Sequence, residues 1–182
     1  GYVAVSRGMV AVGAGDPNAA RRHASDAERW LGREPLTMLL KAQAAQISGD
    51  RAAAEATFTD MLDDAETRVL GFRGLFVEAR RKGDAVAARA YVTKAVELAP
   101  GVSWASEAML EFQSAERDWR GALAKLEQRV AHRSIEKVAA RRQRAVLLTA
   151  DAIDRADKEP EVALASAQAA ALSSTSLLGL TA

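Results

Sequence analysis

The sequence predicts an all-α solenoid of about ten helices stacked as antiparallel pairs, and the prediction rests on three observations. A Gly-Asp pair recurs every 34 residues, with Arg in place of Gly at the fourth step: Gly15-Asp16, Gly49-Asp50, Gly83-Asp84 and Arg117-Asp118. An Ala follows each pair at a fixed distance, and apolar residues come one helical turn later. Self-similarity at a period of roughly 20–50 residues is typical of stacked repeats.

The Ala and the apolar positions after it define one face of the second helix in each unit, because residues four apart lie one turn along the same side. A small side chain at the first position lets this helix lie close on its partner. The fixed positions are Ala20, Ala54, Ala88 and Ala122, then Ala24, Phe58, Val92 and Leu126. The next core position holds Ala27, Met61, Ala95 and, as a departure, Arg129.

The Gly-Asp pair is predicted to join the two helices of a unit. Gly accepts the left-handed conformation that closes a helix, and Asp is a favourable N-cap for the next one. In the first unit Pro17 follows the pair, and Pro favours the first helical position. If the fourth joint needs the same conformation, Arg117 costs about 1 kcal/mol there.

The period divides residues 1–182 into a single repeat array whose fifth unit is irregular. We expect the units to cover approximately residues 1–34, 35–66, 67–100, 101–133 and 134–182. Ser134 is the predicted N-cap of a lengthened helix from Ile135 to about Ala156. In place of Gly-Asp stands Asp157-Lys158-Glu159-Pro160, and Pro160 is predicted to start the partner helix.

The amino-acid composition limits the kinds of core and the classes of function that the chain can have. Aromatic residues are only 5%, so Ala, Leu and Val must build the core. The net charge of +1 gives no overall field to attract nucleic acid. No cysteine is present, which excludes disulfides and thiolate chemistry. We expect the chain to be a piece of a longer protein, because it starts at Gly1 within the repeat pattern. The longest uncharged run, residues 162–182, is about the length of a membrane span, but it is too rich in Ser for one.

The repeat pattern resembles the tetratricopeptide repeat, whose period is about 34 residues. The third unit carries the most signature positions: Phe72, Leu75, Ala79, Ala88, Val92, Ala95 and Pro100. Several signature aromatics are absent from the other units. The resemblance implies a tetratricopeptide-like α-solenoid in which the first helices of successive units line a groove.

Four longer blocks resemble the HemY family of bacterial tetratricopeptide proteins, of the alphaproteobacterial type. They are RGMVAVGAGD (residues 7–16), LGFRGLFVEARRKGD (70–84), LAPGVSWASEAMLEFQ (98–113) and ARRQRAVLLTA (140–150). The resemblance implies a link to heme biosynthesis and membrane helices ahead of the repeats. It also implies an inner-membrane anchor in the full-length protein, with the repeats facing the cytoplasm.

The groove residues are those predicted to face inward from the first helices. They are Tyr2, Val5, Met9, Leu36, Leu39, Gln43, Arg73, Val77, Arg80, Arg81, Trp104, Glu107 and Glu111, with Gln46 and Leu70 beside them. The groove is thus apolar at first, then basic, then acidic. Such a surface suits an extended peptide or a helix with an apolar anchor and charges of both signs.

A basic patch follows in the fifth unit: Arg133, Lys137, Arg141, Arg142 and Arg144. An ordinary solvated helix face explains it, and contact with an acidic protein or anionic lipid is the alternative. Arg129 and His132 precede it in the same basic stretch. No aromatic residue interleaves with these cations, which disfavours single-stranded nucleic acid.

No catalytic or metal-binding pattern stands out, so we expect no enzyme. His23 and His132 are the only histidines, and neither has a second ligand at metal-binding spacing. Glu107 and Glu111 are four residues apart, as in some acid–base sites, but solvated pairs are commoner. The sequence favours a non-enzymatic scaffold that binds a protein or peptide. Direct binding of heme or a porphyrin is the alternative, and otherwise no cofactor is expected.

Overall fold

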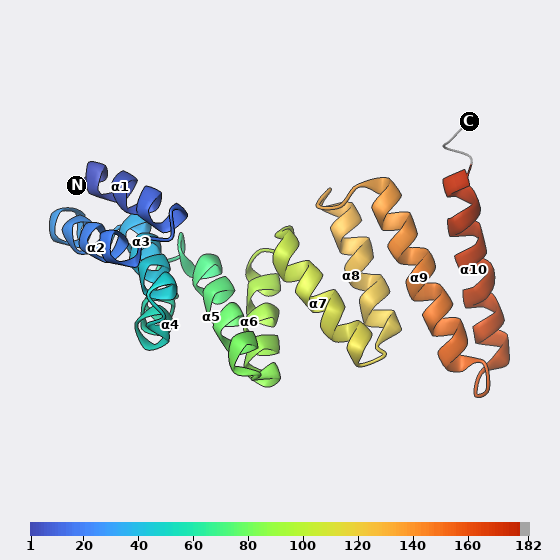
Figure 1. Ribbon diagram of the computed structural model, residues 1–182. Coiled ribbons are helices and arrows are strands. Elements are labelled where there is room, and N and C mark those ends of the chain that lie inside the picture. Colours follow the sequence, from blue (N-terminus) through green and yellow to red (C-terminus); the bar gives the residue numbers. More distant parts are fainter. Residues whose placement is uncertain (179–182) are drawn as a thin grey trace. The chain divides into compact units, whose positions relative to one another are not determined.

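The computed structural model describes residues 1–178, and ten α-helices are found among them (Figure 1). The predicted all-α fold of packed helix pairs is confirmed. The helices are α1 (Tyr2–Gly13), α2 (Pro17–Leu31), α3 (Pro35–Ile47), α4 (Arg51–Asp60), α5 (Arg68–Lys82), α6 (Ala85–Leu98), α7 (Ser103–Ala115), α8 (Trp119–Ala131), α9 (Lys137–Arg155) and α10 (Pro160–Leu178).

The chain forms two compact units, residues 1–94 and residues 95–182, and each is described by itself. In the first unit α1 packs on α2, α3 on α4, and α4 on α5. In the second, α7 packs on α8, α8 on α9, and α9 on α10. The division into five repeat units within a single array stays a prediction.

The Gly-Asp joints have the predicted conformation. Gly15, Gly49 and Gly83 have positive φ angles of 70°, 75° and 76°. After α5, the N–H of Asp84 donates to the carbonyl of Ala79 (3.0 Å), and the Asp84 carboxylate accepts from the N–H of Ala87 (2.9 Å). The same two bonds occur at the other three joints. Each joint therefore satisfies the end of one helix and the start of the next.

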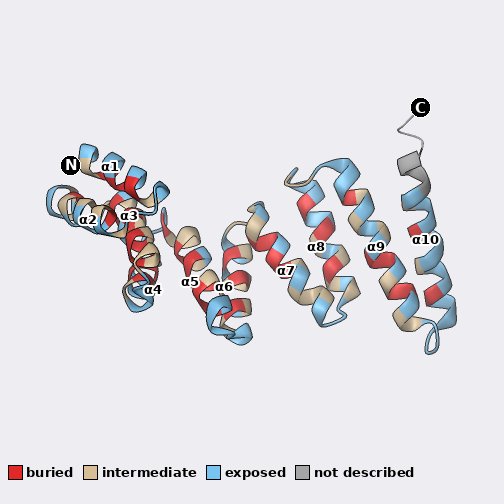
Figure 2. Cartoon of the chain, viewed as in Figure 1, coloured by how far each residue is buried: buried red, intermediate tan, exposed pale blue. Residues whose placement is uncertain are grey.

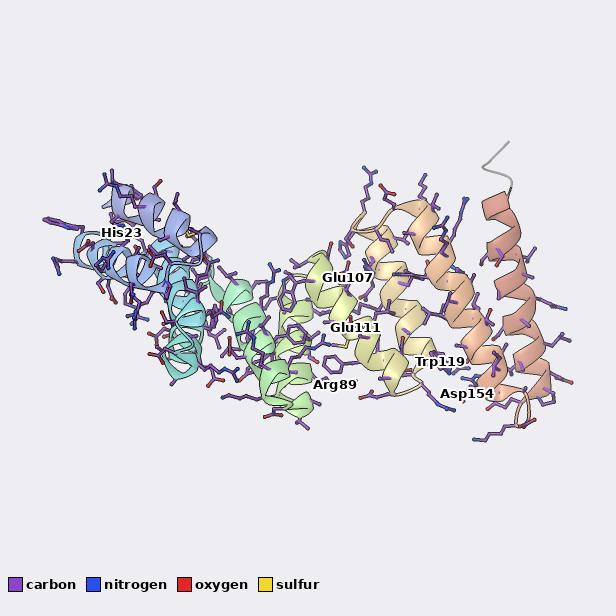
Figure 3. The ribbon with its side chains drawn as sticks, in the orientation of Figure 1. His23, Arg89, Glu107, Glu111, Trp119 and Asp154 are labelled. Carbon is purple, nitrogen blue, oxygen red and sulfur yellow. The ribbon has the colours of Figure 1, made fainter. Side chains whose placement is uncertain are left out.

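Arg117 occupies the left-handed position of the fourth joint. Its φ of 58° costs about 1 kcal/mol for a residue with a Cβ atom, as the sequence suggested. Its guanidinium pairs with Asp154 of α9. The indole Nε1 of Trp119 donates to the same carboxylate at 3.3 Å, and Figure 3 labels both Trp119 and Asp154. The side chain thus makes a contact that Gly could not make.

Two core clusters of the first unit share α3, whose buried residues are red in Figure 2. The first is Val5, Ala11, Ala20, Ala24, Ala27, Leu40 and Ala44. The second is Met38, Ala42, Ala45, Ala54, Phe58, Met61 and Leu75. Leu40 and Ala44 of α3, which are four residues apart, belong to the first cluster. Met38, Ala42 and Ala45, which are three or four residues apart, belong to the second. Residues at this spacing lie on one side of a helix, so α3 carries two buried faces.

Gly74 lets α5 lie directly against Phe58 of α4. A Cβ atom at Gly74 would stand 2.2 Å from the Phe58 ring. Real side chains do not approach so closely, and Phe58 is buried. The position therefore requires Gly for the packing of two helices, and its backbone conformation is ordinary helix.

One core cluster of the second unit lies between α8 and α9. Ala122, Leu126, Ala140 and Leu147 are buried, and Leu110, Trp119, Leu123 and Ile135 pack against them.

The fixed Ala of each repeat is completely buried in all four cases: Ala20, Ala54, Ala88 and Ala122. This result agrees with their predicted place at close helix contacts.

The helix α9 begins two residues later than the sequence suggested. The N-cap of α9 is Glu136, and the prediction of Ser134 is wrong. The Ser134 hydroxyl instead donates to the carbonyl of Arg129 (3.1 Å) in the last turn of α8. It therefore satisfies the end of α8 and does not cap the start of α9. The predicted long helix is present at 19 residues, and Pro160 starts α10 as predicted.

No helix within residues 1–178 has both the length and the apolar content needed to cross a membrane.

Asp151 links α9 to α10 through a buried carboxylate. Its oxygens accept hydrogen bonds from the Ser166 hydroxyl (2.6 Å) and from Nε of Arg155 (2.6 Å). Burial alone would raise the pKa of Asp151, but the bonds from Ser166 and Arg155 outweigh it and lower the pKa. A lowered carboxyl pKa in the folded state stabilises the fold when the group is ionised.

We expect Asp151→Asn to destabilise the α9–α10 pair at neutral pH by about 1–3 kcal/mol, because the charge and one of the two acceptor oxygens are lost, and the remaining oxygen is a neutral acceptor. The wild-type contribution is present above the ordinary Asp pKa of about 3.9 and is lost as the pH falls through the lowered folded value. The difference between the two proteins should therefore shrink in acid. Urea unfolding at pH 7 and at pH 3 measures it, and a difference that does not change with pH would contradict the assignment.

Candidate functional site

A pocket of about 300 Å³ opens between α3 and α5 in the first unit. Phe58 of α4 lies among its lining residues. The full lining is Leu39, Gln43, Gln46, Phe58, Leu70, Arg73, Gly74, Val77 and Arg81. The volume is at the lower end of the range for ligand pockets, roughly 300–1,000 Å³.

Helical spacing explains which side chains line the pocket. Leu39, Gln43 and Gln46 follow one another at intervals of four and three residues along α3. Leu70, Arg73, Val77 and Arg81 do the same along α5. Each set forms one stripe on its helix, and the two stripes face the same pocket.

The pocket brings together five of the predicted groove residues: Leu39, Gln43, Arg73, Val77 and Arg81. The neighbours Gln46 and Leu70 also line it. Phe58, assigned to the core, and Gly74 also line the pocket and were not predicted to do so. The signal for both was the Gly one turn after Leu70, because a position without a side chain lets the Phe58 ring lie directly against α5.

Other predicted groove residues of the first unit lie outside this pocket. Tyr2, Met9 and Leu36 are exposed. Val5 belongs to the core, where its side chain is inaccessible to a partner, so we leave it out of the binding surface. Arg80 stacks its guanidinium over the ring of Phe76, 5.6 Å from the centroid.

Tyr2 makes a specific contact with the start of α3. Its hydroxyl donates to Oε2 of Glu34 at 3.0 Å. This hydrogen bond, together with the negative charge of Glu34, raises the pKa of Tyr2, because both favour the protonated phenol.

Glu78 lies behind the pocket and is only 1% exposed. Its Oε1 accepts a hydrogen bond from Nε2 of Gln46 (2.9 Å) and lies 3.5 Å from Nη1 of Arg81. A buried carboxylate needs such partners, so Gln46 and Arg81 are held on the pocket wall.

The acidic end of the predicted groove lies in the second unit. Trp104 is half-buried, and Glu107 and Glu111 are exposed. Oε1 of Glu107 pairs with Nη2 of Arg129 at 2.9 Å. Arg129 is only 3% exposed, so its expected place in an exposed basic stretch is wrong. It fills the core position that Met61 fills in the second repeat, while its charge reaches Glu107.

The basic patch borders two cavities beside the end of α8. One, of about 310 Å³ between α8 and α9, is lined in part by Lys137, Arg141 and Arg144. The other, of about 750 Å³, includes Arg133 and Lys137 in its lining. Arg142 is exposed and lines neither cavity. Arg144 is paired with Glu127, and that pair partly neutralises the patch.

Neither histidine lies in one of these cavities. His23 is half-buried on α2, and His132 is exposed at the end of α8. Within residues 1–178, no three side chains of His, Asp or Glu gather as metal ligands would.

The helices α1 to α3 and the joint at Gly49 carry the match to a known family. Residues 1–49 match the family described as HemY protein N-terminus. This part of the chain belongs to the HemY family. The resemblance to the HemY family is thus confirmed for residues 1–49, which include the first of the four sequence blocks. The matched residues also include Leu39, Gln43 and Gln46 of the pocket. No curated protein matches the chain, and no solved structure does.

Proposed function

We propose that this chain is a non-enzymatic scaffold that binds a protein partner through the pocket between α3 and α5. The observation that carries the proposal is the gathering of five predicted groove residues in one pocket with apolar and cationic walls. Paired helices that present a groove of this kind recognise extended peptides and helices. The link to heme biosynthesis rests on HemY family membership.

The resemblance also supports a location. The full-length protein is anchored in the inner membrane, and its repeats face the cytoplasm. The partner is a protein or peptide and not a nucleic acid, since the chain has a net charge of only +1.

The test is affinity capture with the full-length, membrane-anchored protein, followed by reconstitution of each captured protein with the purified chain in calorimetry. A captured protein that binds the purified chain at a defined stoichiometry supports the scaffold. Failure of every captured protein to bind the chain directly would overturn it.

Heme titration of the purified chain tests the alternative. Heme or porphyrin binding predicts a saturable shift of the Soret band that is lost when His23 and His132 are changed together to Ala. A linear, unsaturable rise in absorbance is expected for the scaffold.

A further inference from the structure

The pocket between α3 and α5 contains one buried polar atom that the described part of the chain leaves unsatisfied. Oε1 of Gln43 is buried and has no hydrogen-bond partner among the residues the structure describes. A buried acceptor without a donor destabilises a fold. An N–H group supplied by a ligand would satisfy it.

Arg73 supplies the free charge of this pocket. It is exposed, and the described part of the chain offers its guanidinium no hydrogen bond or ion pair. Arg81, in contrast, lies against the buried Glu78, and Arg80 stacks on Phe76 outside the lining. Arg73 is therefore the cation that can donate two parallel hydrogen bonds to a carboxylate.

The remaining walls are apolar. Leu39, Leu70 and Val77 surround the opening, and Phe58 lies where Gly74 has no side chain. These walls favour an apolar side chain, because burying it removes its surface from water. The pocket thus combines an unsatisfied acceptor, an unpaired guanidinium and an apolar lining.

We propose that this pocket binds an extended peptide segment in which an acidic side chain lies close to an apolar one. The carboxylate pairs with Arg73, the apolar side chain enters between Leu39 and Val77, and a main-chain N–H donates to Gln43. A peptide meets all three demands at once. A phosphate backbone lacks the apolar group, and a simple carboxylic acid lacks the N–H donor. The inference rests on the proposed scaffold function and names the chemistry of its partner.

The test uses the complete chain and short capped peptides of Gly and Ser that carry one Leu and one Glu at varied separations. Matched peptides have Gln for Glu, Ala for Leu, or an N-methyl group on the main-chain nitrogen next to Leu. Fluorescence anisotropy of labelled peptides measures the affinity. We expect the best Glu–Leu peptide to bind about tenfold more tightly than its Gln counterpart.

Two protein variants assign the contacts. Arg73→Glu should abolish the preference for Glu over Gln. Gln43→Leu should weaken the parent peptide but not the N-methylated one, because only the parent has the N–H that Gln43 accepts. Arg22→Glu, the same charge change on an exposed position of α2, is the control and should bind like the wild type. Circular dichroism establishes that all three variants remain folded.

Three results would overturn the inference: no binding by any peptide, equal affinity for the Glu and Gln peptides, or equal weakening in the Arg22 control. The scaffold function is tested separately. If the captured protein partner binds Arg73→Glu as tightly as the wild type, the scaffold stands and this pocket is not its contact.

Discussion

Gly74→Ala is expected to destabilise the first unit by about 2 kcal/mol, although Ala is the better helix former by about 1 kcal/mol. The new Cβ would stand 2.2 Å from the buried Phe58 ring, so α4 and α5 must separate. The midpoint of urea unfolding, followed by circular dichroism, measures the loss. Because the same contact forms the floor of the pocket, peptide binding should weaken as well.

Gly13→Ala is the matched control for that change. Gly13 is also helical, but nothing stands within 4 Å of its Cβ position. Ala should therefore stabilise α1 slightly or leave it unchanged. A double variant, Gly74→Ala with Phe58→Leu, tests the cause, since the smaller side chain removes the ring that clashes. Equal losses from Gly74→Ala in the presence and absence of the Phe58 ring would contradict this packing.

Ala122→Leu is expected to destabilise the second unit by about 1–3 kcal/mol. Ala122 is completely buried with Leu126, Ala140 and Leu147, and the larger side chain has no space to enter. For a chain of this size, such a loss lowers the melting temperature by roughly 2–4 °C for each kcal/mol. Thermal unfolding followed by circular dichroism measures the shift.

Ala124→Leu provides the comparison within the same helix. Ala124 is exposed on α8, two residues from Ala122, and Leu there should change the stability by less than about 0.5 kcal/mol. Equal melting temperatures for the two variants would show that the fixed Ala of the repeat does not lie at a close helix contact.

The fold was largely predictable because its signals are local. Gly83 and Asp84 determine a joint through their own φ angle and capping bonds, and the same two residue types recur at a fixed period. The start of α9 was predicted less well, since Ser134 competes for the end of the preceding helix. A single sequence does not show which of two neighbouring helix ends a hydroxyl will satisfy.

The side chains that line the pocket could be predicted from helical spacing, but the burial of two charged side chains could not. Leu39, Gln43, Arg73 and Val77 follow from spacing alone. The burial of Glu78 and Arg129 does not, because long charged side chains are usually exposed. Each is buried only because a residue distant in sequence, Gln46 or Glu107, supplies a partner. Such pairs depend on packing between helices, which periodicity does not report.

The Gly-Asp joint has a kinetic consequence. All of its hydrogen bonds, from the carbonyl of Ala79 to the N–H of Ala87, close within one short stretch of chain. Closing so short a loop takes about 10–100 ns, far less than most distant contacts require. Each joint can therefore form early and hold two helices in register while they collapse. Chains dominated by such short-range contacts fold in microseconds to milliseconds, so transient exposure of the apolar helix faces to aggregation should be brief.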